Sequence, residues 1–230
     1  MFQFKQFTIR QDRCPMKVGT DAVLLGAWAE VRATDRHILD IGTGTGILAL
    51  MLAQRSVASI TGIDISDVSQ ARENAADSAW SSRINFMQCA VQQFESIHSF
   101  DLIISNPPYF VASLLPPDAG RMAARHTTEL PFEALRDAVL RLLSDEGHFA
   151  LILPVAESAR FESVCRGQLS AIRRTEVHTT LDTPVKRVLT EYARHATAHF
   201  EPTSLVIGTG THEEYTAQYR NLTCDFYLKF

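Results

Sequence analysis

The sequence predicts an α/β fold, a mostly parallel β-sheet with helices on both faces and an antiparallel C-terminal edge. From residue 37 onward, short apolar runs alternate with amphipathic stretches at the spacing of βαβ units. A glycine-rich turn at residues 42–46 follows the first of these runs, where it suits a tight strand-to-helix connection. After Gly167 the apolar runs succeed one another without long helices between them, which favours antiparallel pairing.

The expected elements follow from hydrophobic periodicity and turn residues. Strands of the parallel part are expected at residues 38–41, 59–65, 84–87, 100–105 and 148–153. Helices are expected at residues 47–54, 67–79 and 131–143, and within residues 16–31, where Thr20 or Asp21 can cap the helix. Strands of the C-terminal edge are expected at residues 173–180, 198–207 and 222–230. We interpret residues 1–230 as one domain, in which 1–36 form a cover, 37–166 the core and 167–230 the strands that complete the sheet.

Composition narrows the class of protein. With 46% apolar residues the chain can build a sizeable core. Its net charge of −4 argues against a broadly basic nucleic-acid-coating protein, but leaves room for a local basic patch. The first residues carry charges where a signal peptide needs an apolar stretch, and no apolar run approaches the roughly 18 residues of a membrane span. We therefore expect a cytoplasmic protein without a membrane partner.

Cysteine and histidine positions give no metal pattern. The cysteines at positions 14, 89, 165 and 224 lie far apart without a C-x-x-C pair, which suits reduced thiols. His195 and His199 have helical i, i+4 spacing but lack the glutamate of an H-E-x-x-H motif. We expect no metal.

The motif Asn106-Pro107-Pro108-Tyr109 directly follows the apolar run 100–105. Adjacent prolines end a strand and stiffen the loop, which in a parallel sheet lies at the ligand-binding edge. The side-chain carbonyl of Asn106 and the main-chain carbonyl of Pro107 offer two acceptors for a planar NH₂ group, and Tyr109 can stack on its π-system. The alternative is an ordinary turn after a buried strand.

The glycine turn has the form Asp40-x-Gly42-x-Gly44-x-Gly46. Alternate glycines let the backbone approach a ligand closely, and Asp64, at the end of the next strand, can accept both hydroxyls of a ribose. A dinucleotide fold spaces its glycines G-x-G-x-x-G instead. Asp40 would repel a pyrophosphate but suits a ligand with a cationic amine and sulfonium.

These motifs, in this order, resemble a class I S-adenosylmethionine-dependent methyltransferase that acts on exocyclic or amide nitrogens. The leader F-K-Q-F…D-R-C-P-M-K-V-G-T-D-A-V-L-L-G-A-W, with A-R-H at 124–126 and T-P-V-K-R at 183–187, resembles the bacterial tRNA(Val) adenine-N6 methyltransferases. This resemblance implies a Rossmann-like fold with a seven-stranded sheet. It also implies S-adenosyl-L-methionine as cofactor, tRNA as substrate, methylation at N6 of the adenosine next to the anticodon, and no obligatory protein partner.

The resemblance also assigns roles to residues. The expected cofactor-binding residues are Asp40, Gly42, Gly44, Gly46, Asp64, Ile65 and Asn106. The expected catalytic residues are Asn106, Pro107 and Tyr109. The expected substrate-binding residues are Pro108, Tyr109, Arg121, Arg125, Lys186 and Arg187. The chain departs from the family at Ala90, where an acidic residue usually binds the adenine amine; Gln88 or Gln92 can substitute through a side-chain carbonyl.

Related enzymes that act on other amines also contain an N-P-P-Y motif. Glutamine methyltransferases usually carry a helical domain before the glycine turn, and DNA adenine methyltransferases a separate recognition domain, for which this chain has little room. RNA is therefore favoured. Guanine N2 of rRNA, a glutamine amide of a protein, an NAD-dependent reductase and a non-catalytic nucleoside-binding Rossmann module remain alternatives. Basic clusters at 121–126 and 186–195 predict phosphate contacts or, alternatively, a solvated face.

Overall fold

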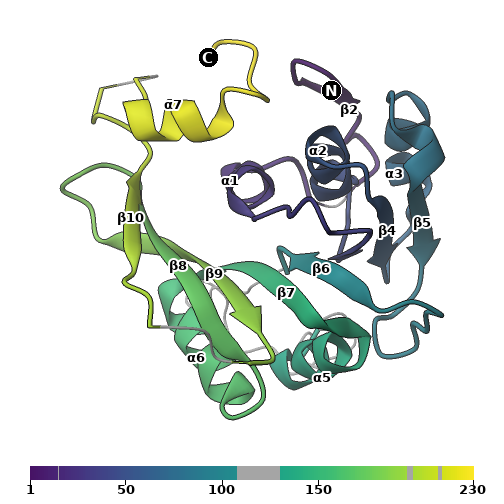
Figure 1. Ribbon diagram of the computed structural model, residues 1–230. Helices are drawn as coiled ribbons and strands as arrows, with labels where there is room; N and C mark the ends of the chain where they lie inside the picture. Colours follow the sequence, from purple (N-terminus) through teal and green to yellow (C-terminus); the bar gives the residue numbers. More distant parts are fainter. Residues whose placement is uncertain (15, 108–129, 196–198, 212–213) are drawn as a thin grey trace, which may run out of the picture.

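The computed structural model describes residues 1–14, 16–107, 130–195, 199–211 and 214–230. Its centre is an eight-stranded sheet in the order β10-β8-β9-β7-β6-β3-β4-β5 (Figure 1). The strands of this sheet are β3 (His37–Ile41), β4 (Ser59–Asp64), β5 (Ile84–Gln88), β6 (Phe100–Ser105), β7 (Leu143–Pro154), β8 (Ser170–His178), β9 (Val185–Ala193) and β10 (Thr203–Val206). The helices are α1 (Thr20–Trp28), α2 (Ile47–Arg55), α3 (Ser69–Ala76), α5 (Phe132–Leu142), α6 (Val155–Cys165) and α7 (Ala217–Thr223), with a short 3₁₀ turn, η1 (Ser81–Arg83).

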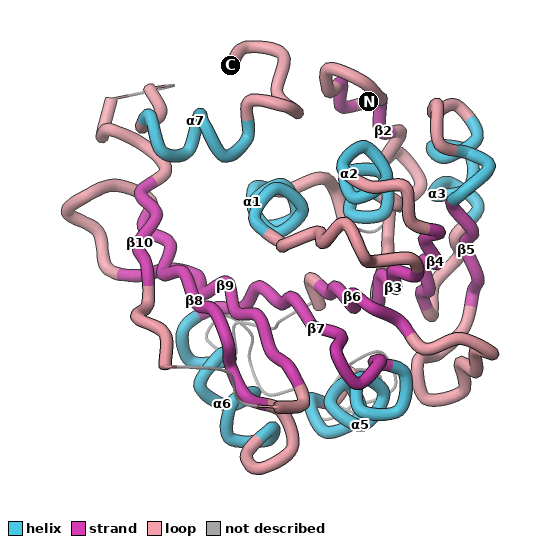
Figure 2. The backbone as a smooth tube through the Cα atoms, viewed as in Figure 1, coloured by secondary structure: helices cyan, strands magenta, loops and turns pink. Residues whose placement is uncertain are grey.

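Helices cover both faces of the sheet. Helices α1, α2 and α3 lie on one face and α5 and α6 on the other (Figure 2). The strands β5, β4, β3, β6 and β7 run parallel, and their buried residues divide into one apolar cluster on each face. Strands buried on both sides explain why these segments are almost continuously apolar in the sequence. The predicted α/β fold with a mostly parallel sheet is confirmed.

The C-terminal edge contains the expected antiparallel pairing. Strand β9 runs antiparallel to both β7 and β8, whereas β10 runs parallel to β8 at the edge. The sheet therefore has one strand more than the seven predicted. Strand β9 was not anticipated, because residues 186, 187, 194 and 195 led us to interpret the segment as a basic cluster.

The predicted strand at residues 222–230 is wrong. Helix α7 occupies the start of this region and is capped by Thr216, whose hydroxyl accepts a hydrogen bond from the Tyr219 amide. The apolar residues after α7 do not pair with a strand. Phe226 belongs to the apolar cluster that contains residues of α1 and α2, and Tyr227 packs against this cluster. A helix-and-turn segment with aromatic residues has enough apolar spacing to resemble a strand in the sequence.

The N-terminal segment is joined to this C-terminal one. A two-stranded hairpin, β1 (Phe2–Gln3) and β2 (Thr8–Ile9), precedes α1, which packs against α2 and is buried over most of its length. Lys5 donates from Nζ to the main-chain carbonyls of Cys224 and Phe230, both at 2.7 Å. None of the helices in the described ranges is long and apolar enough to cross a membrane.

Candidate active site

The glycine turn joins β3 to α2 in a conformation that requires glycine. Gly42, Gly44 and Gly46 have φ angles of 76°, 51° and 81°, a region that residues with a side chain rarely adopt. A Cβ added to Gly42 or Gly44 would meet nothing within 4 Å, whereas one on Gly46 would lie 2.8 Å from the Phe86 ring. The first two glycines therefore leave open space at the sheet edge, and the third allows the turn to pack on β5.

Asp40 lies directly beneath this turn and is fully buried. Its Oδ2 accepts a hydrogen bond of 2.6 Å from the Thr43 hydroxyl, and its Oδ1 has no hydrogen-bond partner among the described residues. Burial, reinforced by the nearby charge of Asp64, raises the pKa of Asp40 to about 7. A buried carboxylate with a spare acceptor is stabilised by a cationic donor, so this position fits the amine or sulfonium of S-adenosylmethionine.

Asp64, at the end of β4, faces the same turn. Its two oxygens accept hydrogen bonds from the amides of Gly44 at 2.9 Å and Ser66 at 2.8 Å. A carboxylate offers about four lone-pair sites, so Asp64 retains acceptors for two hydroxyls. Ile65 follows and is 57% exposed, which gives an apolar surface suited to the flat base of a nucleoside.

The register of the sheet places Asn106 and Pro107 next to the glycine turn. Strands β3 and β6 are parallel neighbours, with Ile41 opposite Ser105, and the Ser105 hydroxyl donates to the Ile41 carbonyl at 2.8 Å. Asn106 therefore leaves β6 beside the point where Gly42 leaves β3. Asn106 is half-buried and Pro107 is buried. Pro108 and Tyr109 lie outside the described residues.

The residues near Ala90 lie where the resemblance expects an acceptor for the adenine amine. Ala90 begins a turn, its carbonyl accepting from the amides of Gln93 and Phe94, and it offers no side-chain acceptor. Gln88, at the end of β5, donates from Nε2 to the Ile65 carbonyl at 3.2 Å. This bond ties Gln88 to the exposed Ile65 and leaves the Gln88 carbonyl oxygen as an acceptor at the same edge.

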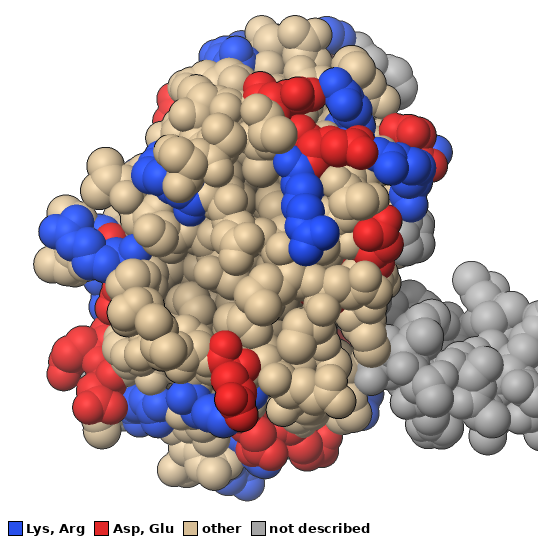
Figure 3. Space-filling model, turned by 90° about the vertical axis from the view of Figure 1, so that its right-hand side faces the viewer, with Lys and Arg blue, Asp and Glu red and all other residues tan. Residues whose placement is uncertain are grey.

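The predicted substrate residues divide into two groups. Lys186 is exposed at the start of β9. Arg187 lies opposite Pro154, at the carboxyl end of β7, and donates from Nε to Asp21 of α1 at 2.7 Å. Arg121 and Arg125 lie outside the described residues. On the face shown in Figure 3, Lys and Arg lie beside Asp and Glu around a broad uncharged area.

Two supporting residues were missed in the sequence. Thr43 holds the Asp40 carboxylate, and Ser105 holds the ends of β3 and β6 together. Both are buried polar residues next to the motifs, and a hydroxyl in an otherwise apolar strand end is the signal that could have indicated them.

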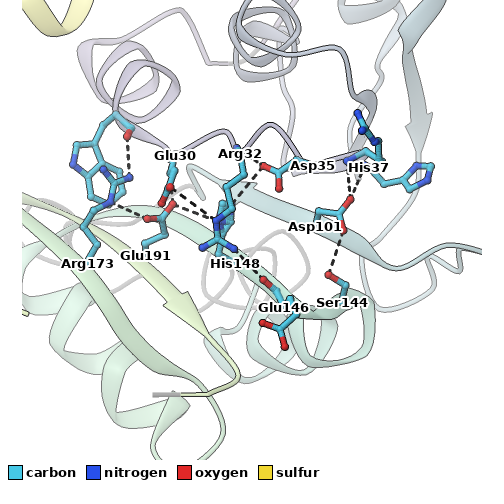
Figure 4. A network of polar contacts seen from close by, with 12 residues as sticks. Glu30, Arg32, Asp35, His37, Asp101, Ser144, Glu146, His148, Arg173 and Glu191 are labelled. Atoms are coloured by element: carbon cyan, nitrogen blue, oxygen red, sulfur yellow. Dashed lines mark hydrogen bonds and ion pairs between the residues drawn. The ribbon is translucent and has the colours of Figure 1, made fainter. Parts of the chain in front are cut away.

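A second polar cluster lies at the opposite, amino end of the strands (Figure 4). Fully buried His148 of β7 lies 3.8 Å from Asp35 and 3.7 Å from Glu191, and Glu191 accepts a hydrogen bond of 2.8 Å from Arg173. Burial lowers the pKa of His148 to about 3. In the described part of the chain, no group of three or more His, Cys, Asp and Glu residues is placed to hold a metal ion.

Comparisons with known proteins agree with this geometry. A model of the "Methyltransferase domain" family matches residues 33–202. The chain is 45% identical to a tRNA1(Val) (adenine(37)-N6)-methyltransferase of Parabacteroides distasonis, covering 99% of this chain and 98% of the relative. It is 41% identical to the protein of the same name from Edwardsiella ictaluri, covering 100% and 94%.

A crystal structure of a predicted O-methyltransferase from Agrobacterium tumefaciens shares the fold. Its TM-score is 0.69 at 21% identity, over 90% of this chain and 96% of that one. The sequence identities extend over the whole length of the chain, and the glycine turn and Asn106 lie at the same edge of the sheet. The chain belongs to the tRNA1(Val) (adenine(37)-N6)-methyltransferases.

Proposed function

We propose that this protein transfers a methyl group from S-adenosylmethionine to N6 of the adenosine next to the anticodon of tRNA(Val). The observation that carries the proposal is the meeting of two sites at one sheet edge. Asp40, the open glycine turn and Asp64 lie at the ends of β3 and β4, and Asn106 with Pro107 follows the adjacent β6. The names of relatives above 40% identity support tRNA as the substrate class. Such an enzyme works in the cytoplasm, where tRNA is found.

The residues present fit the cofactor. The unpartnered Oδ1 of Asp40 suits its cationic end, Gly42 and Gly44 leave room for the backbone to approach it, and Asp64 can accept its ribose hydroxyls. Ile65 offers an apolar surface to the adenine, and Gln88 replaces the carboxylate missing at Ala90 as acceptor for the adenine amine. When bound, S-adenosylmethionine supplies an electrophilic methyl group on sulfur.

Asn106 and Pro107 act on the target amine. Adenine N6 is a poor nucleophile, because its lone pair is delocalised into the ring. Two carbonyl acceptors fix both N–H bonds, aim the lone pair and stabilise the positive charge that develops as the new bond forms. The stiff backbone between buried Pro107 and Ser105 holds these acceptors in place. The product amine loses its proton to solvent, so no separate base is needed.

The substrate is held by stacking and by phosphate contacts. Tyr109, beside Pro108, stacks on the displaced adenine, and Arg121, Arg125 and Lys186 contact phosphates. The ion pair of Arg187 with Asp21 gives it a different role, which is to position the start of β9 against α1. Lys186, its exposed neighbour, is then the phosphate contact of this strand.

The test is to identify the product. Unmodified total tRNA is incubated with the enzyme and labelled S-adenosylmethionine, digested and analysed for modified nucleosides. We expect N6-methyladenosine, confined to tRNA(Val). N2-methylguanosine, or label only in rRNA or protein, would overturn the proposed substrate. Asn106→Ala, which keeps Asp40, Asp64 and the glycine turn, serves as the matched control and should form the product about 10²-fold more slowly.

A further inference from the structure

Helix α3 presents two buried amide side chains to the N-terminal segment. Gln70 and Asn74 lie one helical turn apart and are 2% and 1% exposed. Neither belongs to the residues assigned to the cofactor or the target adenosine. Buried amides of this kind need several hydrogen-bond partners, and both find them in residues 10–13 of the leader, the segment before α1.

Asn74 joins two segments that are otherwise separate. Its Oδ1 accepts from the Arg10 amide at 2.8 Å, and its Nδ2 donates to the Arg10 carbonyl at 3.0 Å, as a neighbouring strand would. The same Nδ2 donates to the Thr45 carbonyl at 2.9 Å. Thr45 lies between Gly44 and Gly46, so one side chain holds both the leader and the glycine turn.

Gln70 fixes the leader further along. Its Oε1 accepts from the Arg13 amide at 3.1 Å, and its Nε2 donates to the Asp12 carboxylate at 2.9 Å. Half-buried Cys14 follows, and its pKa is raised by burial and by the negative charge of Asp64. The charge of Asp64, the carboxylate assigned to the ribose hydroxyls, is therefore felt at the end of the leader.

The glycine turn is held from two sides. Asp64 of β4 fixes the Gly44 amide at 2.9 Å, and Asn74 of α3 fixes the next carbonyl, that of Thr45. Main-chain bonds from the amides of Gly42 and Thr43 to the Ile63 carbonyl hold the start of the turn. Because Gly44 and Gly46 have positive φ angles and little intrinsic conformational preference, the contact at Thr45 adds a restraint to the second half of the turn. A shift of α3 or of the leader would therefore move the Thr45 carbonyl and with it the glycine turn.

We propose that Asn74 is a positioning residue that couples the leader to the glycine turn and thereby sets the affinity for the cofactor. The proposal rests on the function proposed above, since it takes the glycine turn as the cofactor site. Asn74 does not touch the reacting atoms. Its loss should raise KM for S-adenosylmethionine and leave kcat at saturating cofactor largely unchanged, which general loss of stability would not produce.

The first measurement compares cofactor affinity on the full chain by calorimetry with S-adenosylhomocysteine. Asn74→Ala should bind at least 10-fold more weakly, and Asn74→Asp, which keeps the acceptor for the Arg10 amide but loses both donors, should also be weakened. Asp77→Ala is the matched control on the same side of the leader: it breaks only the Arg10–Asp77 ion pair, in which the Asp77 side chain is 57% exposed, and should bind as wild type.

The second measurement approaches the same contact from the leader, and it decides the question if Asn74→Ala fails to fold. Arg10→Pro removes the amide that donates to Asn74, whereas Arg10→Ala keeps it and loses only the side-chain ion pair. Arg10→Pro should lose affinity and Arg10→Ala should not. Folded Asn74→Ala or Arg10→Pro with wild-type affinity would overturn the coupling. Failure of the wild-type protein to bind S-adenosylhomocysteine would instead overturn the proposed function.

Discussion

Asn106 carries the chemistry at the scale of the residue. Asn106→Ala should lower kcat by about 10², roughly 2.7 kcal/mol, because an acceptor is lost where positive charge develops in the transition state. Binding of S-adenosylhomocysteine should be kept, since Asp40, Asp64 and the glycine turn are untouched. Single-turnover methylation at saturating tRNA measures the effect, and a fully active variant would remove Asn106 from the target amine.

Asp40 should link cofactor binding to pH. Because burial raises its pKa to about 7, the free protein holds a proton on Asp40 that a cationic ligand displaces. S-adenosylhomocysteine keeps the cationic amine of the cofactor, though not its sulfonium. Its affinity should therefore rise as the pH increases from about 6 to 8, with net proton release. Asp40→Asn should flatten this dependence.

The same ionisation affects stability with the opposite sign. A carboxyl group whose folded pKa lies above its unfolded value of 3.8 destabilises the free protein as the pH rises from that value through about 7. Asp40→Asn should then raise the Tm of the free protein above pH 7 relative to wild type while weakening cofactor binding. Calorimetry and thermal unfolding over the same pH range give both results, and parallel wild-type and variant curves would contradict them.

At the scale of the element, we expect Lys186 and Arg187, neighbours at the start of β9, to have different roles. Lys186→Ala should lower the slope of log affinity against log salt for tRNA by about 1. Arg187→Ala should instead lower the Tm, because it removes the 2.7 Å ion pair that joins β9 to Asp21 of α1. Asp21→Ala should destabilise similarly, and the double variant should cost less than the sum of the two. A normal Tm in Arg187→Ala together with a reduced salt slope would return Arg187 to the phosphate contacts.

Strand β7 carries a pH dependence of its own through His148. A histidine whose folded pKa of about 3 lies below its unfolded value of 6.5 stabilises the fold above pH 6.5, and this contribution is lost as the pH falls toward 3. The charged groups around it are the buried Asp35 and Glu191 and the partly exposed Arg32 and Arg173. His148→Gln should show a smaller decrease in unfolding free energy between pH 6.5 and 4. Denaturant titrations at each pH measure it, and an unchanged slope would contradict the assignment to His148.

For the whole molecule, we propose that residues 1–230 fold as one unit. Phe4 and Phe226, from opposite ends of the chain, belong to the same buried cluster as residues of β3, β6 and β7, and Lys5 ties the two ends together. Phe226→Ala should lower the free energy of unfolding by about 3–5 kcal/mol, the usual range for a buried phenylalanine. Unfolding by denaturant should remain a single transition that coincides by fluorescence and circular dichroism. Two separate transitions would show that the terminal segments fold apart from the core.

The predicted parallel strands and the glycine turn show what local sequence can specify. A strand buried on both faces must be apolar throughout, and the left-handed turn between β3 and α2 must contain glycine, so both leave a clear local pattern. The positions of Asp40, Asp64 and Asn106 follow once these strands are parallel, because their carboxyl ends then meet at one edge.

Tertiary structure decided the features that depend on partners distant in the chain. Helix α7 and a turn occupy residues 217–230, where the pattern favoured a strand from 222, because Tyr219 and Phe226 are buried against segments more than 150 residues away rather than in a ladder. Arg187 is held by Asp21, 166 positions earlier, and Asn74 holds Arg10, 64 positions earlier. A single charged or amide side chain carries no signal of such a partner. The sequence by itself determined the fold class and the residues of the two motifs, because both depend on local requirements of the backbone: apolar residues in buried strands, and glycine or proline in the turns. Only the tertiary structure determined which polar side chains hold those motifs in place.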